Sequence, residues 1–129
     1  MKYEAAPDLQ MKVDEIARIL FPHVVMERVK VFRSYGSVSR NTIARCHALG
    51  KLMQNALGVK AHYAIEFLTE NFDRLSEKER TKVMVHELMH IPKSFGGGFK
   101  HHDFVCDKNV NFFTRQFEEY KKRKNGYIL

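Results

Sequence analysis

The sequence contains little cysteine and no long apolar run, and these absences exclude or disfavour several classes of protein. Its two cysteines, Cys46 and Cys106, show no C-x-x-C spacing, which favours buried thiols over a disulfide framework or a cysteine-ligated metal. We expect the two thiols on separate helices. No run of about 18 apolar residues exists, and residues 1–8 lack the apolar core of a signal peptide. We therefore expect a cytoplasmic protein that does not contact membranes.

Acidic residues are also scarce, since 15 Asp and Glu stand against 22 Lys and Arg, which gives a net charge of +7. The densest basic cluster, residues 121–124, lies just before Gly126, where cations complement the dipole of a helix end. No zinc ribbon, RNP motif or interleaved aromatic strip accompanies the charge, so nucleic acid is a secondary candidate partner. The remaining composition, 44% hydrophobic and 29% charged, is typical of one globular domain, which we expect to span residues 1–129.

Hydrophobic periodicity predicts an α+β domain with a small mixed or antiparallel sheet packed on three to four helices. Apolar residues spaced by about 3.6 positions predict helices, whereas alternation and β-branched residues predict strands. The predicted helices span residues 8–20, 41–57 and 104–124, with a fourth that begins after Ser76, and the predicted strands span residues 24–34 and 62–68. The helix at 41–57 is predicted from a stripe formed by Ile43, Cys46, His47, Met53 and Leu57.

The fourth helix carries His86, Glu87 and His90 in the pattern H-E-x-x-H. At about 100° per residue, His90 lies about 40° and Glu87 about 100° around the axis from His86, so the three residues share one face. Two imidazoles one turn apart can bind one Zn²⁺, and the adjacent carboxylate can take a proton from a metal-bound water. These residue types at this spacing predict a zinc-dependent hydrolytic centre with Glu87 as its catalytic residue.

The surroundings of the motif support this interpretation. Ser76 and Glu79 form a predicted capping box, which starts a helix at the right distance. From Val83 onward the helix is apolar on every side except at the three motif residues, as in a helix driven into the middle of a domain. A bare buried carboxylate is costly unless it has a partner, and a metal-bound water is one. The alternative is two core histidines and a salt-bridged glutamate on a surface helix.

A third metal ligand is expected after the helix. Pro92 stops the helix, and residues 96–98 form a flexible glycine turn that lets the chain fold back with His101, His102 and Asp103. Adjacent side chains diverge, so His101 and His102 cannot easily both reach one ion. Spacing alone allows either histidine. Asp103 is a candidate N-cap of the last predicted helix.

The segment H-E-L-M-H-I-P followed by F-G-G-G-F-K-H-H-D resembles the small metallopeptidases of archaea and phages, a family of H-E-x-x-H zincins. It is more distantly similar to the SprT-like and WLM-type zinc proteases. The resemblance covers most of the chain and implies a zincin-like domain with the motif helix at its centre. It also implies Zn²⁺ as the cofactor, held by His86, His90 and His102, with His101 as the alternative third ligand.

The resemblance implies a zinc-dependent metallopeptidase in which Glu87 acts as general base toward a metal-activated water. A peptide or protein substrate is expected to dock along the predicted strand at residues 63–68, as in related zincins. The SprT-like enzymes act on protein crosslinked to DNA, but this chain largely lacks their basic regions and accessory domains. The alternatives are a DNA-associated protease and a zinc-stabilised nucleic-acid- or protein-binding module without turnover. Glu87 favours catalysis, since a structural zinc site has no need of it.

Overall fold

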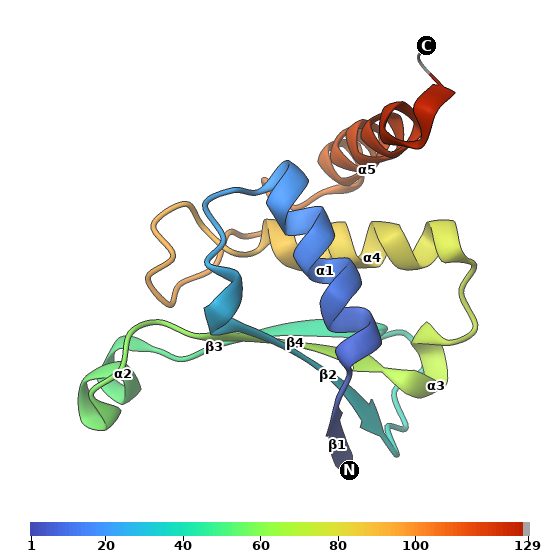
Figure 1. Cartoon of the computed structure of the whole chain (residues 1–129). Coiled ribbons are helices and arrows are strands. Elements are labelled where there is room, and N and C mark those ends of the chain that lie inside the picture. Colours follow the sequence, from blue (N-terminus) through green and yellow to red (C-terminus); the bar gives the residue numbers. More distant parts are fainter. Residues whose placement is uncertain (128–129) are drawn as a thin grey trace.

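The computed structural model describes residues 1–127, which form a four-stranded mixed sheet and five α-helices (Figure 1). The predicted α+β class is confirmed. Residues 128–129 of the expected single domain lie outside the described residues. The elements in chain order are β1 (Lys2–Ala5), α1 (Pro7–Leu20), β2 (Val29–Tyr35), β3 (Ala44–Ala48), α2 (Lys51–Leu57), β4 (Tyr63–Leu68), α3 (Thr69–Phe72), α4 (Glu77–Met89) and α5 (Asp107–Lys122).

The sheet has the strand order β1-β2-β4-β3, so β4 is internal and β3 forms one edge. The pair β2–β4 is parallel, whereas β1–β2 and β3–β4 are antiparallel. Alternate residues of β4 point into the core, as the sequence predicts, because successive side chains of a strand face opposite sides. Tyr63, Ile65 and Phe67 are all at most 2% exposed.

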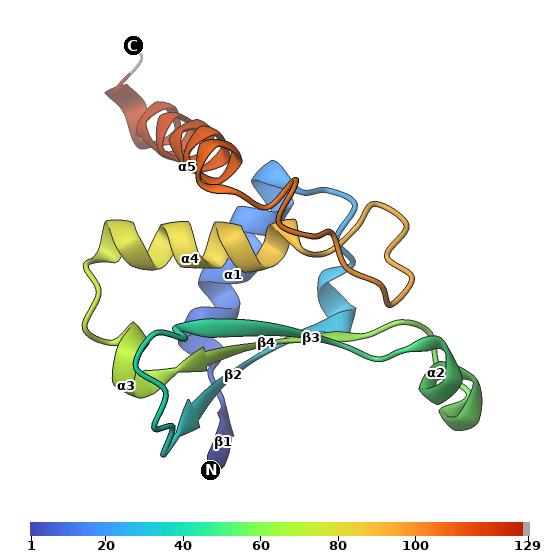
Figure 2. The same ribbon diagram turned by 180° about the vertical axis from the view of Figure 1, so that it is seen from behind.

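Helices α1, α4 and α5 all lie on one face of the sheet, whereas α2 extends beyond one end of it (Figure 1). Seen from behind, the edge strand β3 runs in front of the sheet beneath α4 (Figure 2). The core between these layers is formed by the apolar faces of α1 and α4 and the inward residues of β2 and β4. Among residues 1–127 no helix combines the length and apolar character needed to cross a bilayer.

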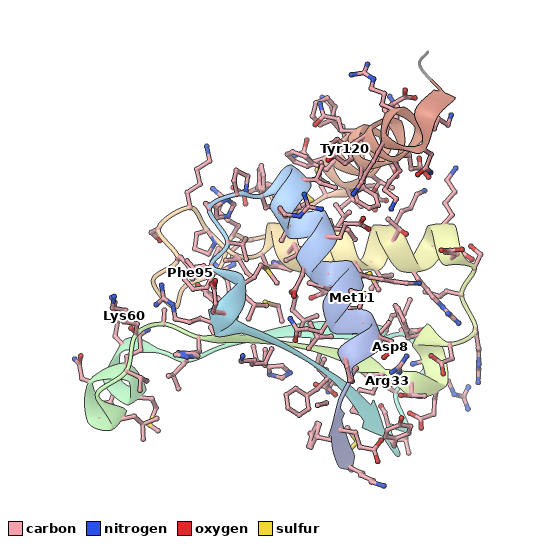
Figure 3. The ribbon with its side chains drawn as sticks, viewed as in Figure 1. Asp8, Met11, Arg33, Lys60, Phe95 and Tyr120 are labelled. Carbon is pink, nitrogen blue, oxygen red and sulfur yellow. The ribbon has the colours of Figure 1, made fainter. Side chains whose placement is uncertain are left out.

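The start of α1 is tied to the sheet by an ion pair. Asp8 lies at the first turn of α1 and faces Arg33 of β2 (Figure 3), with both carboxylate oxygens 2.7 Å from the guanidinium nitrogens. Hydrogen bonds from Arg33 lower the pKa of Asp8 to about 2. The predicted helix at 8–20 is confirmed. It starts one residue earlier, at Pro7, a residue suited to the first helical turn.

The helix predicted at residues 41–57 is wrong. Residues 44–48 form the edge strand β3, and only residues 51–57 are helical. Pairing with β4 decides the conformation, since Cys46 lies opposite Ile65 and alternate residues of β3 are more exposed. Cys46 is thus on a strand rather than a helix.

Two glycines flank α2. Gly50 precedes the helix, and a Cβ added there would meet no atom within 4 Å. Gly58 ends the helix with a φ of 68°, a conformation that favours glycine.

Two other predicted boundaries shift, and one strand was missed. The strand predicted from residue 24 begins at Val29, because residues 26–28 form a 3-10 turn. Strand β1 was not predicted, since its four residues are all exposed. The last helix begins at Asp107 with Cys106 as its N-cap, so Asp103 is not the cap; its carboxylate instead accepts from the amide of Phe104 at 2.9 Å. Both cysteines are free thiols.

Candidate metal and catalytic site

Helix α4 begins with the predicted capping box. The Ser76 hydroxyl accepts from the amide of Glu79 at 3.2 Å, and the Glu79 carboxylate accepts from the amide of Ser76 at 3.1 Å. This pair satisfies two amide groups that a helix start otherwise leaves without partners, which fixes where the helix begins. The later turns are packed between α1, α5 and β3. The motif residues are thus carried on a helix whose start and position are both well determined.

The structure brings His86, His90 and His102 together, with one ligand nitrogen from each ring lying within 4.8 Å of the other two. The Nε2 atoms of His86 and His90 are 3.3 Å apart. Two nitrogens bound to one tetrahedral zinc at about 2.0–2.1 Å are separated by about 3.3 Å, so this pair fits such an ion. His101 is not part of the cluster. Among the described residues, this is the one group of three or more His, Cys, Asp or Glu side chains able to share an ion.

His90 is oriented by the backbone of the glycine loop, residues 92–102. Its Nδ1 lies 2.7 Å from the carbonyl oxygen of Lys100, and the amide of Lys100 donates to the carbonyl of His90 at 2.7 Å. A neutral imidazole that donates from Nδ1 keeps its lone pair at Nε2. This hydrogen bond therefore directs Nε2 of His90 toward His86, as second-sphere contacts do in metal sites.

Two buried side chains hold the glycine loop against the sheet. The Tyr63 hydroxyl donates to the carbonyl of Gly98 at 2.8 Å and accepts from the amide of Gly97 at 3.0 Å. The Gln54 amide nitrogen donates to the carbonyls of Gly96 and Leu49 at 3.1 and 2.7 Å. These bonds fix the loop that returns His102 to the end of α4.

Gly97 is required by this packing. Its φ is +102°, and a Cβ at this position would lie 2.5 Å from the Gln54 amide nitrogen and 2.7 Å from the Leu49 carbonyl oxygen. Both distances are shorter than atoms tolerate, and the backbone conformation favours glycine. The glycine run, which the sequence indicated only as a flexible turn, is a closely fitted loop at this residue.

Glu87 is 6% exposed and lies beside the histidine cluster. Nε2 of His86 lies 3.9 Å from Oε2 of Glu87, and the two form an ion pair only when the imidazole is protonated. Burial raises the pKa of Glu87 to about 7 in the metal-free chain. A carboxylate with little charge compensation and a pKa near neutrality can accept and release protons, which suits a general base.

The two helix histidines favour their neutral forms. Burial lowers the pKa of His86, with a further contribution from the nearby His90 and His102 rings. Burial also lowers the pKa of His90, although the hydrogen bond to the Lys100 carbonyl opposes this. Neutral imidazole is the form that binds metal, so the site favours the binding-competent state.

Two cavities flank the cluster along the edge strand β3. A cavity of about 530 Å³ lies between the residues preceding β3, α4 and the start of α5. A second, of about 330 Å³, lies between β3, α4 and the glycine loop. Ala44, His86 and Glu87 line both cavities, so the two are continuous with the candidate site.

The predicted docking strand at residues 63–68 is wrong. This segment is β4, which is hydrogen-bonded to β2 on one side and to β3 on the other, so it has no free edge. The free edge beside the site belongs to β3, which the sequence predicted as a helix. This error follows from the helix wrongly predicted at residues 41–57. Without the edge strand β3, β4 was the predicted strand nearest to the motif helix.

The remaining histidines lie outside the cluster. His23 is 2.9 Å from the Ile91 carbonyl, His62 is 2.8 Å from the Lys60 carbonyl, and His47 is 2.8 Å from the Glu66 carboxylate. His101 is exposed and lines the smaller cavity. Cys46 also lines that cavity, and burial raises its pKa to about 12, so its thiol stays protonated.

Sequence reasoning missed Tyr63 and Gln54 as residues of the site. Tyr63 lies on the predicted strand, but the partner of its hydroxyl is in a loop 34 residues away in sequence. A buried tyrosine usually has a hydrogen-bond partner, and the nearby glycine run was the available signal for where it lies. Gln54 was hidden within the incorrectly predicted helix.

Comparison with known proteins identified the family of the chain. A protein-family model described as "Putative phage metallopeptidase" matches residues 1–123 of the chain. Neither the search of curated proteins nor the search of solved structures found a match. The matched range includes all of the motif residues, both cavities and the glycine loop.

Proposed function

The chain belongs to the putative phage metallopeptidase family, and on that premise we propose that it is a zinc-dependent metallopeptidase that hydrolyses peptide bonds. The observation that carries the proposal is the position of Glu87 beside three converging imidazoles. A structural zinc site is closed by four protein ligands and needs no adjacent base. Here three nitrogens converge, and the fourth neighbour is a buried carboxylate with a raised pKa.

The donor set fits zinc. Three neutral imidazoles and one open position are a ligand set of catalytic zinc sites, and the chain offers no thiolate in the cluster. His86, His90 and His102 would hold the ion. When bound, zinc would polarise the scissile carbonyl and make a water molecule a stronger acid.

The residues of the chain supply the proton transfers. Glu87 accepts a proton from the attacking water as the new C–O bond forms, and it delivers this proton to the leaving nitrogen as the C–N bond breaks. Its low exposure keeps bulk water from supplying the same proton. His101 lies close enough to line the site but contributes no ligand nitrogen to the cluster.

An extended substrate is proposed to pair with the free edge of β3. The edge strand offers unpaired backbone donors and acceptors next to Glu87, and peptides commonly add a strand to such an edge. The two cavities on either side of Ala44 would then receive side chains on either side of the scissile bond.

A cleavage assay on a peptide library tests the proposal. Purified protein is incubated with the library with and without a zinc chelator, and products are identified by mass spectrometry. We expect cleavage that the chelator abolishes and that added zinc restores, and we expect the exposed helix-start variant Glu77→Gln to remain active. The proposal fails if no peptide is cleaved by zinc-loaded protein, or if cleavage is unchanged by the chelator and by His90→Ala.

A further inference from the structure

Three cations lie on the walls of the two cavities that flank the candidate site. Lys82 lines the larger cavity, one turn of α4 before His86, whereas Arg45 and Lys100 line the smaller one. The acidic residues that line the cavities are Glu87, the proposed base, and Asp107. Asp107 is in the first turn of α5, where the helix dipole partly compensates its charge.

Two of these cations, Lys82 and Lys100, have no carboxylate within ion-pair distance among residues 1–127. Lys100 lies over the ring of Phe104, 5.2 Å from its centroid, instead of beside a carboxylate. Arg45, by contrast, forms an ion pair with Glu66, its partner across the β3–β4 pair, at 3.7 Å, on the opposite side of β3 from the core-facing Cys46.

The sequence explains why neutralising groups are missing. Residues 28–65, which include β2, β3 and α2, contain no Asp or Glu, and neither do residues 88–102, which include the glycine loop. Both segments line the smaller cavity, and residues 41–44 of the first segment also line the larger one. The acidic residues of the chain are concentrated instead in α1, α3, α5 and the start of α4.

We propose, resting on the proposed peptidase function, that the substrate is an acidic protein segment and that Lys82 selects Asp or Glu just after the scissile bond. Pairing with β3 is slightly more stable in the antiparallel direction. An antiparallel substrate runs from the Ala48 end of β3 toward the Ala44 end. Residues after the scissile bond therefore enter the larger cavity, which Lys82 lines, and residues before it pass Lys100 in the smaller one.

The expected change in kcat/KM follows from the known strength of partly exposed ion pairs. Each matched charge should raise kcat/KM about threefold to fivefold, because such pairs lie at the upper end of surface interactions. The preference should weaken as salt is raised, since screening over about 8–10 Å acts on exposed charges at physiological ionic strength.

Matched peptides test the assignment. Three peptides differ only in having Glu, Gln or Lys at the first position after the cleaved bond, and kcat/KM is compared at low and high salt. For wild-type protein, kcat/KM should be highest for the Glu peptide, intermediate for the Gln peptide and lowest for the Lys peptide. Lys82→Gln should remove most of the preference for Glu, whereas Asp107→Asn should increase it. Lys30→Gln removes an exposed cation on β2, outside both cavities, and should leave the order unchanged.

The outcomes separate the inference from the function it rests on. Cleavage of all three peptides at similar rates, or a preference that Lys82→Gln leaves intact, overturns the inference while the peptidase function stands. Absence of cleavage by zinc-loaded protein overturns both. A single-stranded oligonucleotide added as competitor should not inhibit at physiological salt; strong inhibition that Lys82→Gln relieves would assign the cations to nucleic acid and overturn the inference.

Discussion

Glu87 is a charged residue buried where the protein offers it little compensation. Its pKa of about 7 in the metal-free chain is raised by burial above the value of about 4.5 for an exposed glutamate. The folded state therefore holds a proton between these two pH values that the unfolded state has released. The stability that this bound proton contributes is fully present below about pH 4.5 and is lost as the pH rises through 7.

This linkage predicts the pH dependence of stability without metal. In the presence of a chelator, Glu87→Gln should be as stable as wild type near pH 4.5 but more stable at pH 8, by on the order of 3 kcal/mol. Urea unfolding at both pH values measures the difference, and the histidines titrate equally in both proteins. A stability difference that is the same at both pH values would contradict the assigned burial of the charge.

The two neighbouring histidines should behave differently toward zinc. His102→Ala removes one of the three converging nitrogens, so it should weaken zinc binding by at least about 100-fold, whereas His101→Ala should change it less than about threefold. Competition with a chromophoric chelator measures both constants. If His101→Ala loses zinc and His102→Ala retains it, the third ligand is His101.

At the scale of elements, the glycine loop is held by the sheet and so links the sheet to the candidate metal site. Tyr63→Phe leaves the Gly98 carbonyl and the Gly97 amide without their partner, which should loosen the loop that carries His102. We expect the dissociation constant for zinc to rise about 10-fold with the fold retained. The exposed Tyr3→Phe is the matched control. Equal zinc affinity in all three proteins would show that the loop is held by its other contacts.

Elements specified by local signals could be predicted from the sequence. Helix α4 is an example, because the capping box at Ser76 and Glu79 and the motif beginning at His86 lie in one continuous stretch of sequence. His86, Glu87 and His90 followed from helical spacing alone. The choice of His102 over His101 used the glycine loop and a resemblance, and the structure brings His102 rather than His101 to the other two rings.

Elements specified by distant partners could not be predicted. Residues 44–48 contain alanine, arginine, cysteine and histidine, which are compatible with a helix, and they form β3 because β4 offers a free edge. Strand β1 pairs with β2 across about 30 residues of sequence and has no buried residue to mark it. The contacts of Tyr63 and Gln54 with the glycine loop depend on this topology, so residue spacing did not predict them.

At the scale of the whole molecule, a bound metal should stabilise the fold. The cluster joins α4 to the segment after the glycine loop, and an ion bound only by the folded state adds RT ln(1 + [zinc]/Kd) to the unfolding free energy. Free zinc at 1,000 times Kd should add about 4 kcal/mol. Chemical unfolding with zinc and with chelator measures this. A gain that persists in His102→Ala would place the stabilising ion elsewhere.

The most direct test of the central claim combines zinc binding and turnover in one titration. Metal-free wild type and Glu87→Gln are titrated with zinc, and bound zinc and peptide hydrolysis are followed together. We predict that both proteins bind one zinc per chain. Hydrolysis by wild type should rise with bound zinc, while Glu87→Gln should be slower by at least about 100-fold, because only the base is removed. Equal hydrolysis by the two zinc-loaded proteins, or hydrolysis by metal-free wild type, would contradict the claim.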